Sequence, residues 1–283
     1  MESPDTTSLS VRLRHDVVVL HHQLDRSAAA LAAGVTPAAI HKTRVAARRL
    51  RVLLRAYRGE FDSKQGKRYR RILKRLTRDL EAAREADVTR RTIRGLAKDG
   101  KGYVNGHSRP LYERAVASYE SAVYGLRLTM ASAAWQRRLG DLRELSELSS
   151  LVKANEDSAV RAMHRVLKRR RRRLHDALER AGRSPKRLHR VRLKIKTMRY
   201  LLENGLSKSA IARDAELKRL RQLQNCLGDM HDEENLLKAL RAERPHREAA
   251  RDICTQLEAR KNRYYHAFKR QRKSLMHLWN GAA

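Results

Sequence analysis

The stretch that decides the fold is HKTRVAARRLRVLLRAY, residues 41–57, because a variant of it recurs as HRVRLKIKTMRYLLENG at residues 189–205. Matching residues lie 148 positions apart. In both copies a histidine is followed by basic residues 3, 7 and 10 positions later, a spacing that puts side chains on one side of an α-helix. The sequence therefore predicts two equivalent helices, each with a positively charged stripe about 15 Å long.

Each predicted helix pairs its basic stripe with an apolar one. The first basic stripe contains His41, Arg44, Arg48, Arg51 and Arg55, and the second contains His189, Arg192, Lys196 and Arg199. The apolar residues lie one position earlier, about 100° around the helix: Ala47, Leu50 and Leu54 in the first copy, and Val191, Ile195, Met198 and Leu202 in the second. We therefore expect one face to pack and its neighbour to bind an anion longer than a single phosphate.

The repeat continues beyond these helices. Residues 73–88, LKRLTRDLEAAREADV, match residues 220–235, LRQLQNCLGDMHDEEN, at an offset of 147. These segments are predicted to form the next helix of each half. Their basic residues are weaker candidates for the same site, since similar spacings are common on solvated helix faces; they are Arg71, Lys74, Arg75, Arg78, Lys218 and Arg221.

Helical periodicity runs through the whole chain, and no alternating segment of strand length interrupts it. Thr36-Pro37 and Ser184-Pro185 are typical helix starts, and Gly100, Gly102 and Gly106 indicate a loop. The expected helices cover 8–33, 37–58, 64–98, 109–147 (broken), 155–182, 185–204, 208–241 and 245–279. We predict an all-α domain at 8–279, with an N-terminal half at 8–147 and a C-terminal half at 155–279, each a bundle of about four helices.

Charge restricts the partner. The 283 residues include 65 Lys and Arg against 31 Asp and Glu, a formal net charge of +34 with a sequence pI near 11.2. This surplus indicates a polyanionic partner: DNA, RNA, anionic lipid or inorganic polyphosphate. Two cysteines, no signal peptide at the N-terminus and no apolar run of about 20 residues favour a cytoplasmic protein with free thiols and no membrane association.

The two histidine segments resemble the signature segments of the CHAD family, the conserved histidine α-helical domain. The second elements of the halves resemble it less closely: Glu81 stands where the family tends to have Gly, and His231 stands where Arg is usual. The resemblance implies a pseudo-twofold pair of four-helix bundles whose basic central channel binds inorganic polyphosphate, with association to polyphosphate granules as a possible task. Because the ExExK motif of the triphosphate tunnel domain is absent, the chain resembles a stand-alone CHAD protein.

Polyphosphate offers closely spaced negative charges and no base or apolar face. Arginine suits such a ligand because a planar guanidinium can pair with two phosphate oxygens, and lysine adds a mobile point charge. His41 and His189 could donate to phosphate, or they could only orient neighbouring helices. If they contact phosphate, binding is expected to couple to their protonation and to tighten below pH 7.

Two other functions compete with polyphosphate binding. The charge alone would suit nonspecific nucleic-acid binding, but aromatic residues are only 5% of the chain, which leaves few platforms for stacking bases. A phosphotransferase or polyphosphatase would need carboxylates or a phosphate loop among the cations, and neither stripe contains a carboxylate at a binding position. The sequence therefore predicts a binding protein, with no catalytic residue, cofactor or metal site. The dense run KRRRRR, residues 168–173, is expected to divide between a channel rim, solvent and acidic neighbours.

Overall fold

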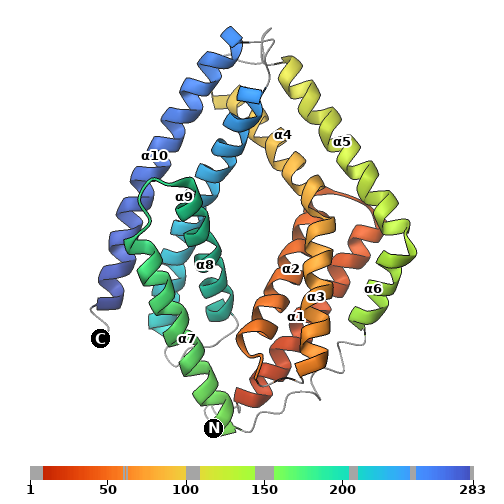
Figure 1. The fold of residues 1–283 in the computed structure, drawn as a ribbon, viewed down its shortest axis with the longest axis vertical. Helices are drawn as coiled ribbons and strands as arrows, with labels where there is room; N and C mark the ends of the chain where they lie inside the picture. The colour runs from red at the N-terminus through yellow and green to blue at the C-terminus, as the bar shows by residue number, and fades with distance from the viewer. Residues whose placement is uncertain are drawn as a thin grey trace. The chain divides into compact units, whose positions relative to one another are not determined.

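The structure, a computed structural model, describes residues 9–59, 61, 63–99, 109–143, 156–203, 210–242 and 247–280. Within these ranges it contains ten α-helices and no β-strand, which confirms the predicted all-α class. The loop expected at Gly100, Gly102 and Gly106 lies outside the described residues. The helices, shown in Figure 1, are α1 (Leu9–Ala33), α2 (Pro37–Ala56), α3 (Ser63–Asp79), α4 (Glu81–Asp99), α5 (Arg109–Ala131), α6 (Ala133–Arg143), α7 (Glu156–Glu179), α8 (Pro185–Glu203), α9 (Ala210–Ala242) and α10 (Arg247–Asn280).

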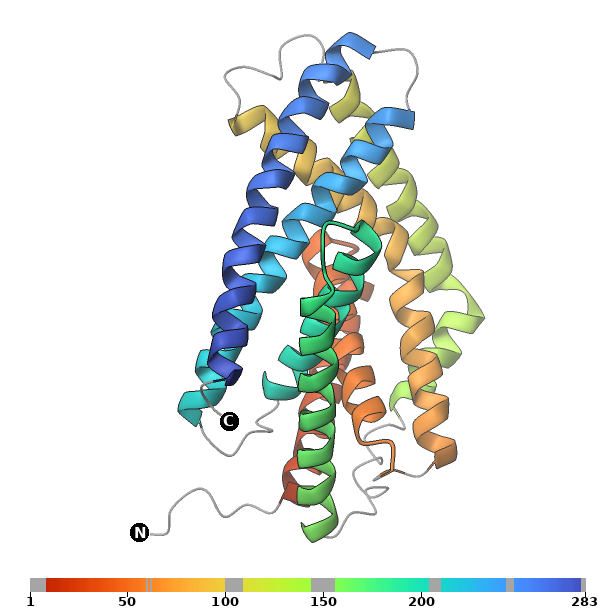
Figure 2. The same cartoon turned by 60° about the vertical axis from the view of Figure 1, so that its left-hand side comes forward.

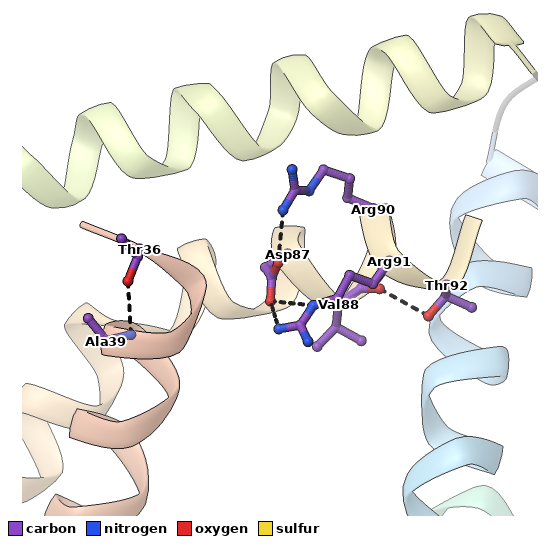
Figure 3. A network of polar contacts seen from close by, with 7 residues as sticks. All are labelled: Thr36, Ala39, Asp87, Val88, Arg90, Arg91 and Thr92. Atoms are coloured by element: carbon purple, nitrogen blue, oxygen red, sulfur yellow. Dashed lines mark hydrogen bonds and ion pairs between the residues drawn. The ribbon is translucent and has the colours of Figure 1, made fainter. Parts of the chain in front are cut away.

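Both repeated helices begin where the sequence predicts. The Thr36 hydroxyl accepts a hydrogen bond from the Ala39 backbone N–H at 3.1 Å (Figure 3), and Pro37 occupies the first turn of α2, where no N–H is needed. Pro185 takes the same position in α8. Upstream of it, Gly182 has a φ of 51°, a left-handed conformation that lets the chain turn from α7 into α8.

Two of the expected helices are divided. The segment predicted at 64–98 forms α3 and α4, which meet at Leu80, although backbone hydrogen bonds from Leu80 to Leu76 (3.4 Å) and from Arg84 to Leu80 (3.2 Å) continue across the junction. The break expected within 109–147 lies at Ser132, whose hydroxyl accepts from the Trp135 backbone N–H at 3.3 Å and so caps α6.

The chain forms two compact units. Unit 1 comprises Met1–Ala86 with Tyr119–Lys168, and unit 2 comprises Asp87–Ser118 with Arg169–Ala283. Each unit includes segments of both predicted halves. The division into halves at 8–147 and 155–279 rests on the sequence repeat and stays a prediction. The same holds for the predicted pseudo-symmetry of two four-helix bundles.

Unit 1 is built on α2. This helix packs against α1 on one side and α3 on another, and α3 also contacts α6. Its apolar stripe is buried as predicted, with Ala47, Leu50 and Leu54 all 0% exposed. Leucines of α3 and the indole of Trp135 in α6 complete the core. This packing leaves the basic side of α2 at the edge of the core rather than within it.

Unit 2 is built on α9, which packs against α8 and α10. Figures 1 and 2 both show α9 and α10 running side by side along much of their length. The predicted apolar stripe of α8 is buried here too: Val191, Ile195, Met198 and Leu202 are at most 1% exposed. Farther along α9, leucines pack with Leu257 of α10, and Ile93 of α4 lies against this cluster.

A buried carboxylate joins three helices of unit 2. Glu216 of α9 accepts hydrogen bonds from Arg171 of α7 (Nη2 at 2.8 Å, Nε at 3.3 Å) and from the indole of Trp279 of α10 (2.8 Å). The Glu216 side chain is only 6% exposed. One arginine of the KRRRRR run therefore has an acidic neighbour, as predicted, while Lys168, Arg169 and Arg172 are exposed.

A second buried carboxylate lies on α4. Asp87 is 1% exposed and accepts from Arg90 Nη2 at 3.2 Å and from Arg91 Nε at 3.0 Å, with Arg91 Nη2 also paired to it (Figure 3). Thr92 donates to the Val88 carbonyl one turn earlier at 3.0 Å. Both arginines are on the same helix, one turn after the aspartate, so the acid is neutralised locally.

The order of helices repeats as the sequence does. α1 and α7 have 25 and 24 residues, and α2 and α8 have 20 and 19. α3 and α4 together span 63–99, and α9 spans 210–242, which starts 147 positions later. The helix bounds therefore follow the offset of the sequence repeat, while the symmetry of the two halves stays a prediction.

No described helix combines the length and the apolar character needed to cross a membrane.

Candidate polyanion-binding surfaces

The basic stripe of α2 lies beside its buried face. His41 and Arg55, at its two ends, are exposed, whereas Arg44, Arg48 and Arg51 are half-buried. The residues occupy one side of the helix because the buried apolar stripe fixes its rotation. The predicted separation of a packing face and a charged face is confirmed for α2.

Arg44 is the most constrained member of this stripe. Its Nη1 donates to the Thr77 carbonyl at 2.9 Å and its Nη2 pairs with Glu81 Oε1 at 3.3 Å. The side chain is 12% exposed, and burial lowers its pKa, while Glu81 acts in the opposite direction. Arg44 thus joins α2 to the α3–α4 junction, a structural task that the stripe pattern did not predict.

In the turns of α2 that follow Arg44, several arginine side chains lie close enough to repel one another. Burial lowers the pKa of Arg51, and repulsion from Arg48, Arg55 and Arg78 lowers it further, whereas Glu81 raises it. Arg78 comes from α3, so the two helices bring their cations together. We call these four arginines, Arg48, Arg51, Arg55 and Arg78, the α2 surface. Their mutual repulsion would be relieved by a bound anion.

The other candidates on α3 are Arg71, Lys74 and Arg75, and all three are exposed. Arg70, which the sequence analysis did not select, is the residue that lies near Arg55: its Nη1 donates to the Leu54 carbonyl at 3.3 Å, and burial, Arg58 and Arg55 all lower its pKa. Eight residues separate Arg70 from Arg78, which puts the two about 80° apart around the helix, so spacing alone gave no signal for Arg70.

The stripe of α8 begins at a pair of imidazoles. His189 is exposed, and its ring centroid lies 5.5 Å from that of His231 on α9. Burial lowers the pKa of His231 to about 4, and the charges of Arg192, His189, Lys196 and Lys238 act in the same direction. His189, Arg192, Lys196 and His231 form what we call the α8 surface. His231 was noted only as a departure from the family pattern, although it matches Arg84 of the first copy at the offset of 147.

The far end of α8 is neutralised by an acid. Glu203 lies 3.5 Å from Arg199 Nε and 3.4 Å from Arg221 Nη2 of α9. Lys218, one turn before Arg221, is exposed. Arg199 and Arg221 therefore share one carboxylate.

Although the predicted binding positions of the stripes hold no carboxylate, two carboxylates contact arginines of the stripes. The fold brings Glu81 against Arg44 and places Glu203 between Arg199 and Arg221. Glu81 comes from α4, and Glu203 is in the last turn of α8, at the position where the first stripe has Arg55. Each carboxylate is ion-paired with arginine.

Replacing Glu81 with Gln should strengthen polyanion binding. The change removes a negative charge beside Arg44 and Arg51 and weakens the hydrogen bond that holds Arg44 Nη2, because an amide oxygen is a weaker acceptor than a carboxylate. We expect affinity to rise about 2- to 10-fold at low salt, the range of a single partly exposed charge pair. Fluorescence anisotropy with labelled long-chain polyphosphate measures it.

The matched control is Glu113→Gln. It makes the same change in net charge on α5, where Glu113 pairs with Arg109 and both side chains are mostly exposed. It should leave affinity nearly unchanged. Weaker binding by Glu81→Gln would mean that Glu81 holds Arg44 in its binding orientation, contrary to this prediction.

Two groups of potential metal ligands occur among the described residues. The ligand atoms of His21, His22 and Asp25 lie within 4.8 Å of one another, as do those of His175, Asp176 and Glu179. The buried His21 is engaged by the fold: its Nε2 lies 2.7 Å from the Leu142 carbonyl and its Nδ1 lies 3.3 Å from Asp25. Neither group adjoins the basic stripes in sequence, and we assign neither a role in polyanion binding.

Comparison with known proteins agrees with this architecture. The CHAD domain family matches residues 19–241. The chain is similar to the crystal structure of the CHAD domain from the plant Ricinus communis, with a TM-score of 0.75 and 20% identity over 97% of this chain and 95% of that one. It is also similar to PptA from Streptomyces chartreusis, with a TM-score of 0.71 and 15% identity over 97% of this chain and 100% of that one. No curated protein matches the chain by sequence.

Proposed function

Because the chain belongs to the CHAD domain family, we propose that it binds inorganic polyphosphate through the α2 and α8 surfaces. The observation that carries the proposal is the crowding of Arg51 by Arg48, Arg55 and Arg78, which concentrates positive charge at the edge of the unit 1 core. Guanidinium groups at this density suit a ligand whose negative charges are equally close together. The resemblance to CHAD proteins supports the same ligand.

The composition of the α2 surface favours polyphosphate over nucleic acid as the ligand. The four side chains of the α2 surface are all arginines, with no aromatic residue among them, and base stacking is a main source of affinity for single strands. Both ligands would bind more weakly as salt increases. Salt dependence alone does not separate them.

Competition separates the two ligands. With labelled long-chain polyphosphate bound, unlabelled polyphosphate should displace it at a far lower phosphate concentration than duplex DNA or single-stranded RNA. Equal displacement by duplex DNA at equal phosphate concentration would favour a nonspecific nucleic-acid-binding protein instead.

Chain length tests whether one polymer engages both surfaces. A ligand that reaches a second surface gains effective concentration, so affinity should increase by about 10²-fold or more between triphosphate and long chains. Neutralising either surface alone should abolish that gain. An affinity per phosphate that is the same at every length would show that the surfaces act separately.

We further propose that the protein is not a polyphosphatase. Glu81 and Glu203, the carboxylates that contact stripe arginines, are ion-paired with guanidinium groups rather than grouped to bind a metal. Incubation with polyphosphate and Mg²⁺ or Mn²⁺ should release no free phosphate above the blank. Such a binding protein could serve at the surface of polyphosphate granules in the cytoplasm, and its co-localisation with granules tests this.

A further inference from the structure

His231 is the half-buried imidazole of the α8 surface, and its ring centroid lies 5.5 Å from that of the exposed His189. It lies half-buried on α9, and its neighbours on α8 are His189, Arg192 and Lys196. The matching position of the first copy holds Arg84, which stays charged. At this position the first copy therefore has a fixed positive charge and the second copy has a titratable group.

The surroundings of His231 favour its neutral form. On α8 it faces the three basic residues just named, and on its own helix Lys238 adds a further positive charge. Four acids flank it on α9: Asp229, which is attracted by Arg260 and Arg192, Asp232, Glu233, which pairs with Arg260 of α10 at 2.9 Å, and Glu234, which pairs with Lys261 of α10 at 2.8 Å. Burial, and after it the positive neighbours, lower the pKa of His231 to about 4, so it is uncharged at pH 7 in the free protein.

The contact with Asn235 accommodates both protonation states. Asn235 Nδ2 lies 3.4 Å from His231 Nε2, so the amide can donate to the neutral ring. An amide that rotates by half a turn presents its oxygen instead and can accept from a protonated ring. Protonation of His231 therefore needs no movement of α9.

We propose that polyphosphate binding at the α8 surface is coupled to the uptake of a proton by His231. This inference rests on the proposed function. A polyanion along His189, Arg192 and Lys196 neutralises the charges that keep His231 uncharged, and each added negative charge favours the imidazolium. Once protonated, His231 supplies the cation that Arg84 supplies permanently in the first copy. Affinity should then increase as pH falls, by up to tenfold per pH unit for one proton, because the unbound protein must gain that proton on binding.

Isothermal titration calorimetry with long-chain polyphosphate tests the coupling. Binding heats measured at pH 6.5 in two buffers of different ionisation enthalpy give the number of protons taken up. The comparison is between the full-length parent chain and His231→Arg, which carries a permanent charge at the position. The variant should bind at least as tightly as the parent at pH 8 and should take up fewer protons, with a weaker dependence of affinity on pH. Equal proton uptake by parent and variant overturns the inference.

A second measurement does not depend on how the variant folds. The His231 ring proton signal of the parent, assigned by its loss in His231→Asn, should report the neutral form at pH 6.5 in the free protein and shift toward the imidazolium position when polyphosphate is added. An unchanged position at saturating ligand overturns the inference. His266→Asn, an exposed histidine of α10, is the control and should leave proton uptake unaltered. If the parent does not bind polyphosphate, the proposed function fails, whereas binding without proton uptake removes only this coupling.

Discussion

The double variant Arg48→Gln/Arg51→Gln should lose about 10²- to 10⁴-fold in affinity for long-chain polyphosphate, since each charge-assisted hydrogen bond contributes about 1.5–3 kcal/mol. These two arginines lie at the centre of the α2 surface, between Arg44 and Arg55. Glutamine keeps much of the side chain, so α2 should remain packed. Fluorescence anisotropy at constant salt measures the loss.

The same variant should be at least as stable as the parent. Arg48 and Arg51 repel each other, and Arg51 is also repelled by Arg55 and Arg78, so removing two charges relieves strain in the free protein. The urea midpoint should stay constant or rise. Reduced binding with preserved stability identifies a binding surface, whereas reduced binding with reduced stability would indicate damage to the fold.

The control for the double variant is Arg263→Gln/Lys273→Gln on α10. Both residues are exposed, and the change in net charge is the same. Affinity should fall less than about fivefold, because exposed charges that belong to neither surface are largely screened at physiological ionic strength. A loss as large as that of Arg48→Gln/Arg51→Gln would mean that total charge, rather than the α2 surface, determines binding.

Replacing Glu216 with Ala should destabilise the protein by about 2–4 kcal/mol, the range for leaving buried polar groups without a partner. The carboxylate accepts from Arg171 and from the indole of Trp279, so its loss removes the polar link between α7, α9 and α10 and leaves the indole N–H without its acceptor. Urea denaturation followed by circular dichroism measures the change.

The control is Glu258→Ala. Glu258 pairs with Arg241 between α10 and α9, but both side chains are about half exposed or more. Its removal should cost less than about 1 kcal/mol. A similar cost for the two variants would show that burial of Glu216 contributes little. Glu216→Gln, which can still accept from Trp279, should lie between them.

The helices and their two faces were predictable because they depend on local pattern. Thr36-Pro37 and Ser184-Pro185 mark the starts of α2 and α8, and the apolar stripes behind the basic residues are buried in both copies. The α3–α4 junction at Leu80 was missed because it contains neither Gly nor Pro, and its backbone hydrogen bonds continue. In the second copy the matching position, Leu227, lies inside the uninterrupted α9.

The partners of the basic residues were less predictable. Glu81 reaches Arg44 from another helix, so the contact depends on how α4 follows α3 rather than on spacing within α2. For His231, the neighbouring charges come from α8, more than 30 positions earlier in the chain. Pattern within one helix identifies the charged face, but the side chains that balance its charge are determined by packing.

The two tryptophans of the chain fall one in each compact unit. Trp135 is 2% exposed in unit 1, and Trp279 donates to Glu216 in unit 2. Each single variant, Trp135→Phe or Trp279→Phe, keeps one tryptophan. Its tryptophan fluorescence therefore reports on one unit alone. Coincident denaturation curves from the two indoles would make the chain one cooperative folding unit, and separate curves would give each unit its own free energy of unfolding.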